Sequence, residues 1–114
     1  VYSHGGTKKT EYFALEWIDK VQNLGAGEIL LTSMDKDGTK SGYELDLTGK
    51  IAELVSVPVI ASGGAGNPEH LRDVFLQSRA DAAIVASITH YGEFSISSIK
   101  SYLQQEEIPV RNVW

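Results

Sequence analysis

The sequence predicts an α/β fold of the parallel (β/α)-barrel type, present only as a partial, or half, TIM barrel. Three short apolar segments, residues 28–32, 57–62 and 82–87, lack the polar alternation of strands that face water. Amphipathic helical patterns separate them at short, regular intervals, which is typical of parallel strands joined by crossover helices. Three strands cannot close a barrel, and a doubly wound open sheet is the structural alternative.

The first half of the chain predicts a helix, a strand and a second helix. Thr10 is suited to cap a helix that Gly25 ends. Its apolar residues recur at helical spacing: Ala14, Trp17, Ile18, Val21 and Leu24. The strand is expected from Glu28 to Thr32, because this segment is too short for a helix and has glycine beside it. The second helix contains Gly49, which weakens it, and its apolar residues are Leu47, Ile51, Leu54 and Val55.

The second half repeats the order strand, helix, strand, helix. A strand over residues 57–62 runs into Gly63-Gly64-Ala65-Gly66. Asn67 then predicts an N-cap with Pro68 at the first helical position. The inner face of that helix is expected to carry Leu71, Val74 and Phe75. A strand over residues 82–87 and a final helix capped by Ser95 follow, the helix with the apolar residues Ile96, Ile99 and Leu103.

Composition excludes several classes of function. The 114 residues suffice for one ordinary domain, and 42% hydrophobic with 22% charged residues is typical of a folded protein. A formal net charge of −5 argues against binding nucleic acid, which calls for a basic face. There are no cysteines, and no apolar run approaches the length of about 20 residues that crosses a bilayer. We therefore expect a cytoplasmic protein without a membrane or nucleic-acid partner.

Small or polar residues follow each predicted strand: Thr32-Ser33, Ser62-Gly63-Gly64 and Ala86-Ser87. In parallel α/β folds ligands bind at the carboxyl ends of the strands, where loops and helix N-termini meet. The glycine loop offers backbone N–H groups just before a helix, which suits a phosphate. The residues at 86–90 predict a short helix directed at the same anion. Glycines that merely permit a tight turn are the alternative for the glycine loop.

Asp35 and Asp37 follow the first predicted strand and lie one residue apart. In an extended segment they point to the same side, and two neighbouring carboxylates suit acid/base chemistry. A solvated polar turn that Gly38 permits is the simpler alternative. An EF-hand loop over residues 33–44 is a remote one, because Ser33 replaces the first aspartate and the preceding segment is a strand. His4, His70 and His90 lack metal-ligand spacing, so we expect neither a metal nor a cofactor.

Three segments carry a specific resemblance to a known family: LGAGEILLTSMDKDGTKSGYELDL, VPVIASGGAGNPEHL and ADAAIVASITHYGEFSISSIKSYL. Together they resemble the C-terminal half of the cyclase subunit of imidazole glycerol phosphate synthase, an enzyme of histidine biosynthesis. The resemblance implies a (β/α)8 barrel that receives ammonia from a glutaminase subunit. It also implies that the barrel cleaves and cyclises a ribulosyl formimino aminoimidazole carboxamide nucleotide, which yields imidazole glycerol phosphate and aminoimidazole carboxamide ribotide.

The resemblance also assigns roles to single residues. Asp37 matches a catalytic aspartate, with Asp35 and Thr32 in support. The phosphate site of this half of the barrel matches Gly38, Gly63, Gly64, Ala86 and Ser87. A second catalytic aspartate and a second phosphate loop of the family have no counterpart in this sequence. Residues 1–114 are therefore expected to form a single C-terminal segment without its N-terminal half.

The resemblance leaves the activity and the partners of the segment open. We expect it to be inactive alone and to associate with the absent half or with itself. Two alternatives for its function stay open: a non-catalytic half-barrel that binds phosphorylated ligands, and a paralogous ammonia-channelling subunit that amidates sugars.

Overall fold

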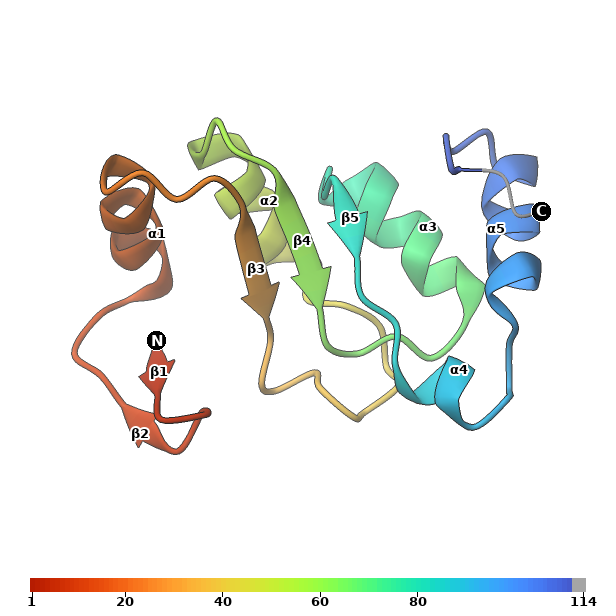
Figure 1. Ribbon diagram of the computed structural model, residues 1–114, viewed down its shortest axis with the longest axis horizontal. Helices are drawn as coiled ribbons and strands as arrows, with labels where there is room; N and C mark the ends of the chain where they lie inside the picture. The colour runs from red at the N-terminus through yellow and green to blue at the C-terminus, as the bar shows by residue number, and fades with distance from the viewer. Residues whose placement is uncertain (112–114) are drawn as a thin grey trace.

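Three parallel strands form the centre of the molecule, of which the computed structural model describes residues 1–111. Figure 1 shows the elements following one another from an N-terminal hairpin at one end to a helix at the other. The strands and helices are β1 Tyr2–Ser3, β2 Lys8–Lys9, α1 Ala14–Asn23, β3 Ile29–Thr32, α2 Leu45–Leu54, β4 Val59–Ser62, α3 Pro68–Gln77, β5 Ala82–Ala83, α4 Ser87–His90 and α5 Ile96–Gln105.

The central sheet has the strand order β3-β4-β5, and both of its pairs are parallel. Thr32 lies level with Ser62, and Ile60 lies level with Ala82. Strands that follow their chain order in this way, each joined to the next by a helix, agree with part of a (β/α) barrel. The described residues close no barrel.

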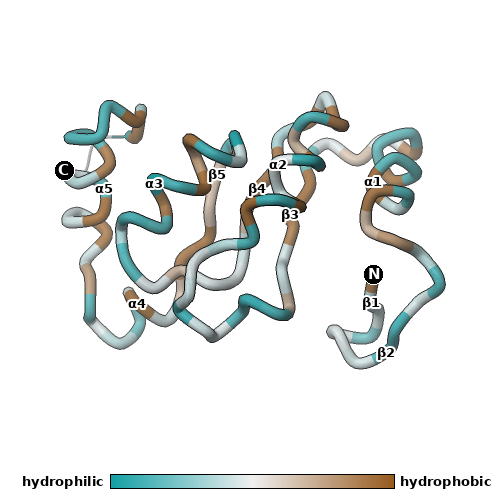
Figure 2. Tube along the Cα trace, turned by 180° about the vertical axis from the view of Figure 1, so that it is seen from behind, coloured by the Kyte–Doolittle hydropathy of each residue, from teal (hydrophilic) through white to brown (hydrophobic). Residues whose placement is uncertain are grey.

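Four helices, α1, α2, α3 and α5, cover one face of this sheet. Figure 1 shows α2 and α3 behind the strands, and Figure 2 shows the helices from their own side. Ile29, Val59 and Ala61 point toward the helices and are buried. Because side chains alternate along a strand, the next residues face the other way, and Leu30 keeps 57% of its surface exposed. A doubly wound sheet has helices on both faces, so that alternative is wrong for residues 1–111.

Two hydrophobic clusters fill the space between the sheet and the helices. The first joins α1, α2, β3 and β4 through the buried side chains of Ile18, Ile29, Ile51 and Val59. The second joins α3 and α5 to β4 and includes Leu71, Val74, Ala61, Ile99 and Leu103. Both follow from the predicted amphipathic patterns, except that three residues assigned to inner faces are exposed, namely Leu24, Leu54 and Ile96.

Two of the predicted helix caps are confirmed and one is wrong. The Asn67 side chain accepts a hydrogen bond from the His70 N–H, with Pro68 at the start of α3, and Ser95 caps α5 through the Ser98 N–H. Thr10 does not cap α1, because that helix starts at Ala14 with no capping side chain. The Thr10 hydroxyl instead donates to the Val1 carbonyl, at 2.8 Å.

The other differences concern strands. The antiparallel hairpin of β1 and β2 was not predicted, since its two-residue strands are too short and polar to show a pattern. The strand predicted over residues 82–87 is also wrong at its end. Only Ala82–Ala83 pair with β4, and Ser87 already belongs to α4.

Candidate functional site at the carboxyl ends of the strands

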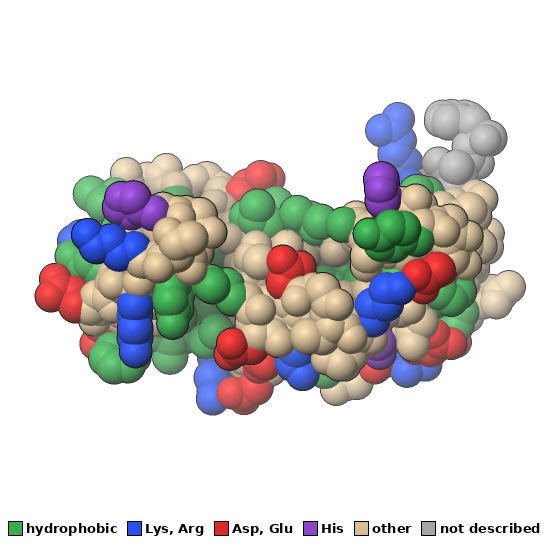
Figure 3. Space-filling model, turned by 90° about the horizontal axis from the view of Figure 1, so that it is seen from below, with side chains coloured by type: hydrophobic (Ala, Val, Ile, Leu, Met, Phe, Trp, Pro, Cys, Tyr) green, Lys and Arg blue, Asp and Glu red, His purple; other side chains and the backbone are tan. Residues whose placement is uncertain are grey.

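Three loops lie together at the carboxyl end of the sheet: residues 33–44 after β3, 63–67 after β4 and 84–86 after β5. They share this end because the strands are parallel and in register, with Thr32 beside Ser62. Figure 3 looks onto this end, where carboxylate side chains stand among backbone and small polar residues. A row of hydrophobic side chains runs along its margin.

The loop that carries Asp35 and Asp37 is a tight turn. The N–H groups of Lys36 and Asp37 donate to the Ser33 carbonyl, at 3.3 and 2.9 Å. The extended geometry assumed for the two aspartates is therefore wrong, and their spacing does not by itself bring the two side chains to one side. Both are exposed. Gly38 has a φ of 75° in this turn, a conformation that favours glycine.

The glycines of the 63–67 loop are required by close contact with the 33–44 loop. A Cβ on Gly63 would lie 2.8 Å from the Ser33 carbonyl oxygen and 3.3 Å from the Asp37 Cβ. A Cβ on Gly64 would lie only 2.1 Å from the Gly42 carbonyl oxygen. The structure thus brings Asp37 directly against Gly63.

The tight-turn explanation and the phosphate explanation of these glycines both remain compatible with the geometry. Gly63 and Gly64 have φ values of 92° and 108°, which a turn of this kind demands. At the same time, their N–H groups donate to no acceptor within residues 1–111. The Gly66 N–H, by contrast, donates to His70.

Ala86 and Ser87 lie at the start of the short helix α4, as predicted. The Ala86 carbonyl accepts hydrogen bonds from the N–H groups of Thr89 and His90, at 3.1 and 2.8 Å. The 33–44 loop reaches this region too, because Lys40 forms an ion pair with Glu93, just after α4. Its ammonium group also lies 5.9 Å from the ring centroid of Tyr91.

Thr32, the last residue of β3, lies at the same end of the sheet. It is exposed and two residues beyond Leu30, so both side chains lie on the face of the sheet that carries no helix. Of the predicted site residues, the structure places Asp37, Gly63 and Gly64 in direct or neighbouring contact. Asp35, Gly38, Thr32, Ala86 and Ser87 share the same end of the sheet.

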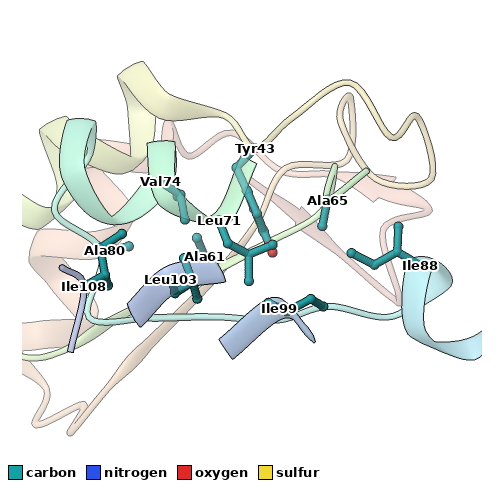
Figure 4. Close-up of a cluster of buried hydrophobic side chains, with 10 residues drawn as sticks. All are labelled: Tyr43, Ala61, Ala65, Leu71, Val74, Ala80, Ile88, Ile99, Leu103 and Ile108. Atoms are coloured by element: carbon teal, nitrogen blue, oxygen red, sulfur yellow. The ribbon is translucent and has the colours of Figure 1, made fainter. Parts of the chain in front are cut away.

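Sequence reasoning missed Tyr43, which ties the 33–44 loop to the 84–86 loop after β5. Its ring is buried in the second hydrophobic cluster, as Figure 4 shows, and its hydroxyl donates to the Ile84 carbonyl at 2.7 Å. Burial raises the pKa of Tyr43 because the charged phenolate would lose its hydration. The signal in the sequence was one aromatic residue inside an otherwise polar loop.

The calcium-loop alternative does not fit the structure. An EF-hand loop needs a helix on each side, whereas β3 precedes this loop. Glu44, at the position of the last calcium ligand, instead caps α2 by accepting a hydrogen bond from the Leu47 N–H. Residues 1–111 contain no group of three His, Asp or Glu side chains arranged to hold a metal.

Comparison with known proteins identifies the family. The sequence profile described as "Histidine biosynthesis protein" matches residues 1–95. The chain belongs to this family. It is 60% identical over 111 residues to the imidazole glycerol phosphate synthase subunit HisF of Pelodictyon phaeoclathratiforme, and 56% identical to the HisF subunit of Methanocaldococcus jannaschii.

The matches cover nearly the whole chain but only part of each relative. The two alignments span 97% of this chain and 44% and 41% of the respective HisF subunits. The resemblance to the cyclase subunit, found from the segments around Asp37 and Gly63, is confirmed. Among residues 1–111, no helix is long and apolar enough to cross a membrane.

Proposed function

We propose that residues 1–114 form the C-terminal half of a (β/α)8 cyclase barrel of imidazole glycerol phosphate synthase. The observation that carries this proposal is the one-sided sheet. Helices cover one face of β3, β4 and β5, while the other face exposes Leu30 and Ile84 as the inner wall of an incomplete barrel would. The match to somewhat less than half of each HisF relative supports the same reading.

In this proposal the carboxyl end of the sheet contributes half of the substrate site. Asp37 is the general acid/base of ring closure, and Asp35 and Thr32 support it. The phosphate group is held near the N–H groups of Gly63 and Gly64, with Gly38, Ala86 and Ser87 beside it. Support comes from the close approach of Gly63 to the Cα and Cβ of Asp37.

In this proposal the reaction also needs a group opposite Asp37. The complete enzyme uses ammonia from a glutaminase subunit to convert the ribulosyl formimino aminoimidazole carboxamide nucleotide into its two products. An acid/base pair requires a second group across the barrel mouth, so we propose that the chain acts in the cytoplasm with an N-terminal half or a second copy. The apolar side chains on the uncovered sheet face favour such association.

Reconstitution tests the proposal most directly. We expect ammonia-dependent turnover when the chain is combined with the N-terminal half of a HisF relative. Asp37→Asn should lower kcat by about 100-fold or more, because it removes proton transfer in the transition state. The matched control is Asp19→Asn, an exposed aspartate on α1, which should leave turnover unchanged.

Two outcomes contradict parts of this proposal. Full activity of Asp37→Asn would remove Asp37 from the chemistry. Absence of turnover with retained binding of inorganic phosphate, measured by ³¹P NMR titration, would favour the non-catalytic phosphate-binding half-barrel. Sedimentation of the isolated chain checks association, since a monodisperse monomer would contradict it.

A further inference from the structure

His70 contacts both loops that form the candidate site. It lies in the first turn of α3, where its main-chain N–H donates to the Asn67 side chain at 3.0 Å. Its ring turns back toward the 63–67 loop, and Nδ1 accepts the Gly66 N–H at 3.1 Å. Nδ1 is thus the acceptor in this bond, and Nε2 lies on the other edge of the ring.

The other edge of the His70 ring lies against the 33–44 loop. A Cβ built on Gly42 would lie 3.5 Å from the ring Cδ2 and 3.6 Å from Nε2. Gly42 is buried and has a φ of 100°. The ring of His70 therefore faces Gly42, at a distance that a Cβ at this position would fill in ordinary van der Waals contact, and Gly42 belongs to the loop that carries Asp37.

These contacts continue to the candidate site through the two glycine segments. The Gly42 N–H donates to the Gly64 carbonyl at 2.8 Å, which joins the two loops. The neighbouring residue, Gly63, is the one in contact with Asp37. A shift of the His70 ring would thus move Gly42 relative to Gly66. It would also change the distance between Asp37 and the N–H groups of Gly63 and Gly64.

We propose that His70 is a positioning residue that fixes the spacing between the Asp37 loop and the Gly63-Gly64 loop. It acts through the Gly66 hydrogen bond on one side of its ring and through contact with Gly42 on the other. The role in substrate binding rests on the proposed function, whereas the role in holding the two loops does not. The proposed role needs no contact between His70 and substrate. The residue also lines a groove of about 420 Å³ together with Lys36, Tyr43 and Asp73.

The experiment compares one substitution of His70 that keeps only the hydrogen-bond acceptor with one that keeps only the ring. His70→Asn keeps an acceptor oxygen near the position of Nδ1, whereas His70→Phe keeps the ring and removes the acceptor. Asn67→Ala is the matched control, since it weakens the start of α3 but leaves the imidazole in place. Amide hydrogen exchange of Gly66 and Gly42, measured by NMR on the whole chain, is the first readout.

We expect His70→Phe to speed exchange at Gly66 by about tenfold, the effect of about one lost hydrogen bond. Exchange at Gly42 should become about tenfold faster as well, because the ring is no longer held in place by the Gly66 bond. His70→Asn should restore slow exchange at Gly66. Unchanged Gly42 exchange in His70→Phe would overturn the proposal, because His70 would then hold only its own loop. Faster exchange at both Gly66 and Gly42 in Asn67→Ala would also overturn the proposal, because the change would then come from a weakened start of α3 and not from the His70 ring.

Titration with inorganic phosphate is the second readout. His70→Phe should weaken phosphate binding by about fivefold or more, with His70→Asn closer to the wild type, since spacing of the glycine N–H groups sets the anion site. If the wild-type chain binds no phosphate, the proposed phosphate site fails while the exchange data still decide the role of His70. Should His70→Phe not fold, His70→Gln replaces it, because its longer side chain carries the acceptor away from Gly66.

Discussion

The two ends of the central sheet are built differently. At the amino end, the strands are joined by direct bonds between neighbours: the Ile29 N–H donates to the Pro58 carbonyl, and the Asp81 N–H donates to the Val59 carbonyl, both at 2.9 Å. At the carboxyl end such a bond is present as well, from the Ser33 N–H to the Ser62 carbonyl at 3.0 Å, and in addition loops contact other loops through glycines, as Gly64 does against Gly42. In (β/α) barrels the first kind of end serves stability and the second carries the site.

The glycines at the two ends of the sheet differ in the same way. At the amino end, a Cβ on Gly27 would meet no atom within 4 Å. At the carboxyl end, the Cβ of an alanine at Gly63, Gly64 or Gly66 would collide with backbone. Glycine at positions 63, 64 and 66 is therefore required by tertiary contact, and substitutions at the two ends separate the two cases.

The largest effect is expected from Gly64→Ala. The new Cβ would lie 2.1 Å from the Gly42 carbonyl oxygen, in a backbone with a φ of 108°. Strain and overpacking together should cost about 3–5 kcal/mol of unfolding free energy and displace the 33–44 loop. Urea unfolding measures this, with Gly27→Ala as the control that should change stability by less than about 1 kcal/mol. Equal effects of the two substitutions would remove the contrast between the ends.

Tyr43→Phe tests the bond that ties the 33–44 loop to the 84–86 loop after β5. It leaves the Ile84 carbonyl without its donor and should lower stability by about 1–2 kcal/mol. If Tyr43→Phe has the same free energy of unfolding as the wild type at neutral pH, the bond does not stabilise the fold.

Tyr43 also predicts a dependence on alkaline pH. Burial raises its pKa above the value in the unfolded chain, so the folded state is favoured while the phenol stays neutral. The stabilisation from the neutral Tyr43 phenol is complete below about pH 10. It is lost as the pH rises further, because the tyrosine of the unfolded chain ionises before that of the folded chain. Thermal unfolding followed from pH 8 to about 11 should therefore show a steeper loss in the wild type than in Tyr43→Phe.

Asp81→Ala tests the amino end. The Asp81 carboxylate accepts the Val59 N–H at 2.9 Å, and its removal should cost about 1–2 kcal/mol because Asp81 is exposed and water replaces part of the bond. Asp81→Asn retains an acceptor oxygen and serves as the control. Phosphate binding should stay unchanged in both variants, and a loss of binding would show that the two ends are coupled.

Gly49→Ala should give the smallest effect, and a stabilising one. Gly49 lies inside α2, has no positive φ, and a Cβ there would make only ordinary contacts with Ser78, the nearest at 3.6 Å. Alanine should raise the unfolding free energy by about 0.5–1 kcal/mol through its better helix propensity. Differential scanning calorimetry measures the shift, and a lower melting temperature would show that the contact with Ser78 is tighter than its distance indicates.

Much of the fold follows from local patterns in the sequence. Asn67 followed by Pro68 predicts the start of α3, and Ser95 predicts that of α5, because each cap bonds within its own first turn. The failures have local causes as well. Thr10 is a residue type that can cap a helix, but its hydroxyl instead donates to the Val1 carbonyl across the N-terminal hairpin. The hairpin itself has too few residues for periodicity to reveal it.

The candidate site was predictable in composition but not in arrangement. The segments around Asp37 and Gly63 identify the family and place both at the ends of strands. Their direct contact, the Tyr43 bond to Ile84 and the position of the His70 ring depend on how three loops pack together. The assumption of an extended segment at Asp35 and Asp37 failed for the same reason, since the loop is a turn.

Sequence patterns alone predict the order of strands and helices from α1 to α5, the family, and the residue types available at the carboxyl ends of the strands. These depend on spacing, capping and apolar periodicity, which act over a few residues. The tertiary structure adds that Gly63, Gly64 and Gly66 are required by contact between loops and that one face of the sheet carries no helix among residues 1–111. Such features join residues distant in the chain, where excluded volume and hydrogen-bond geometry decide the outcome.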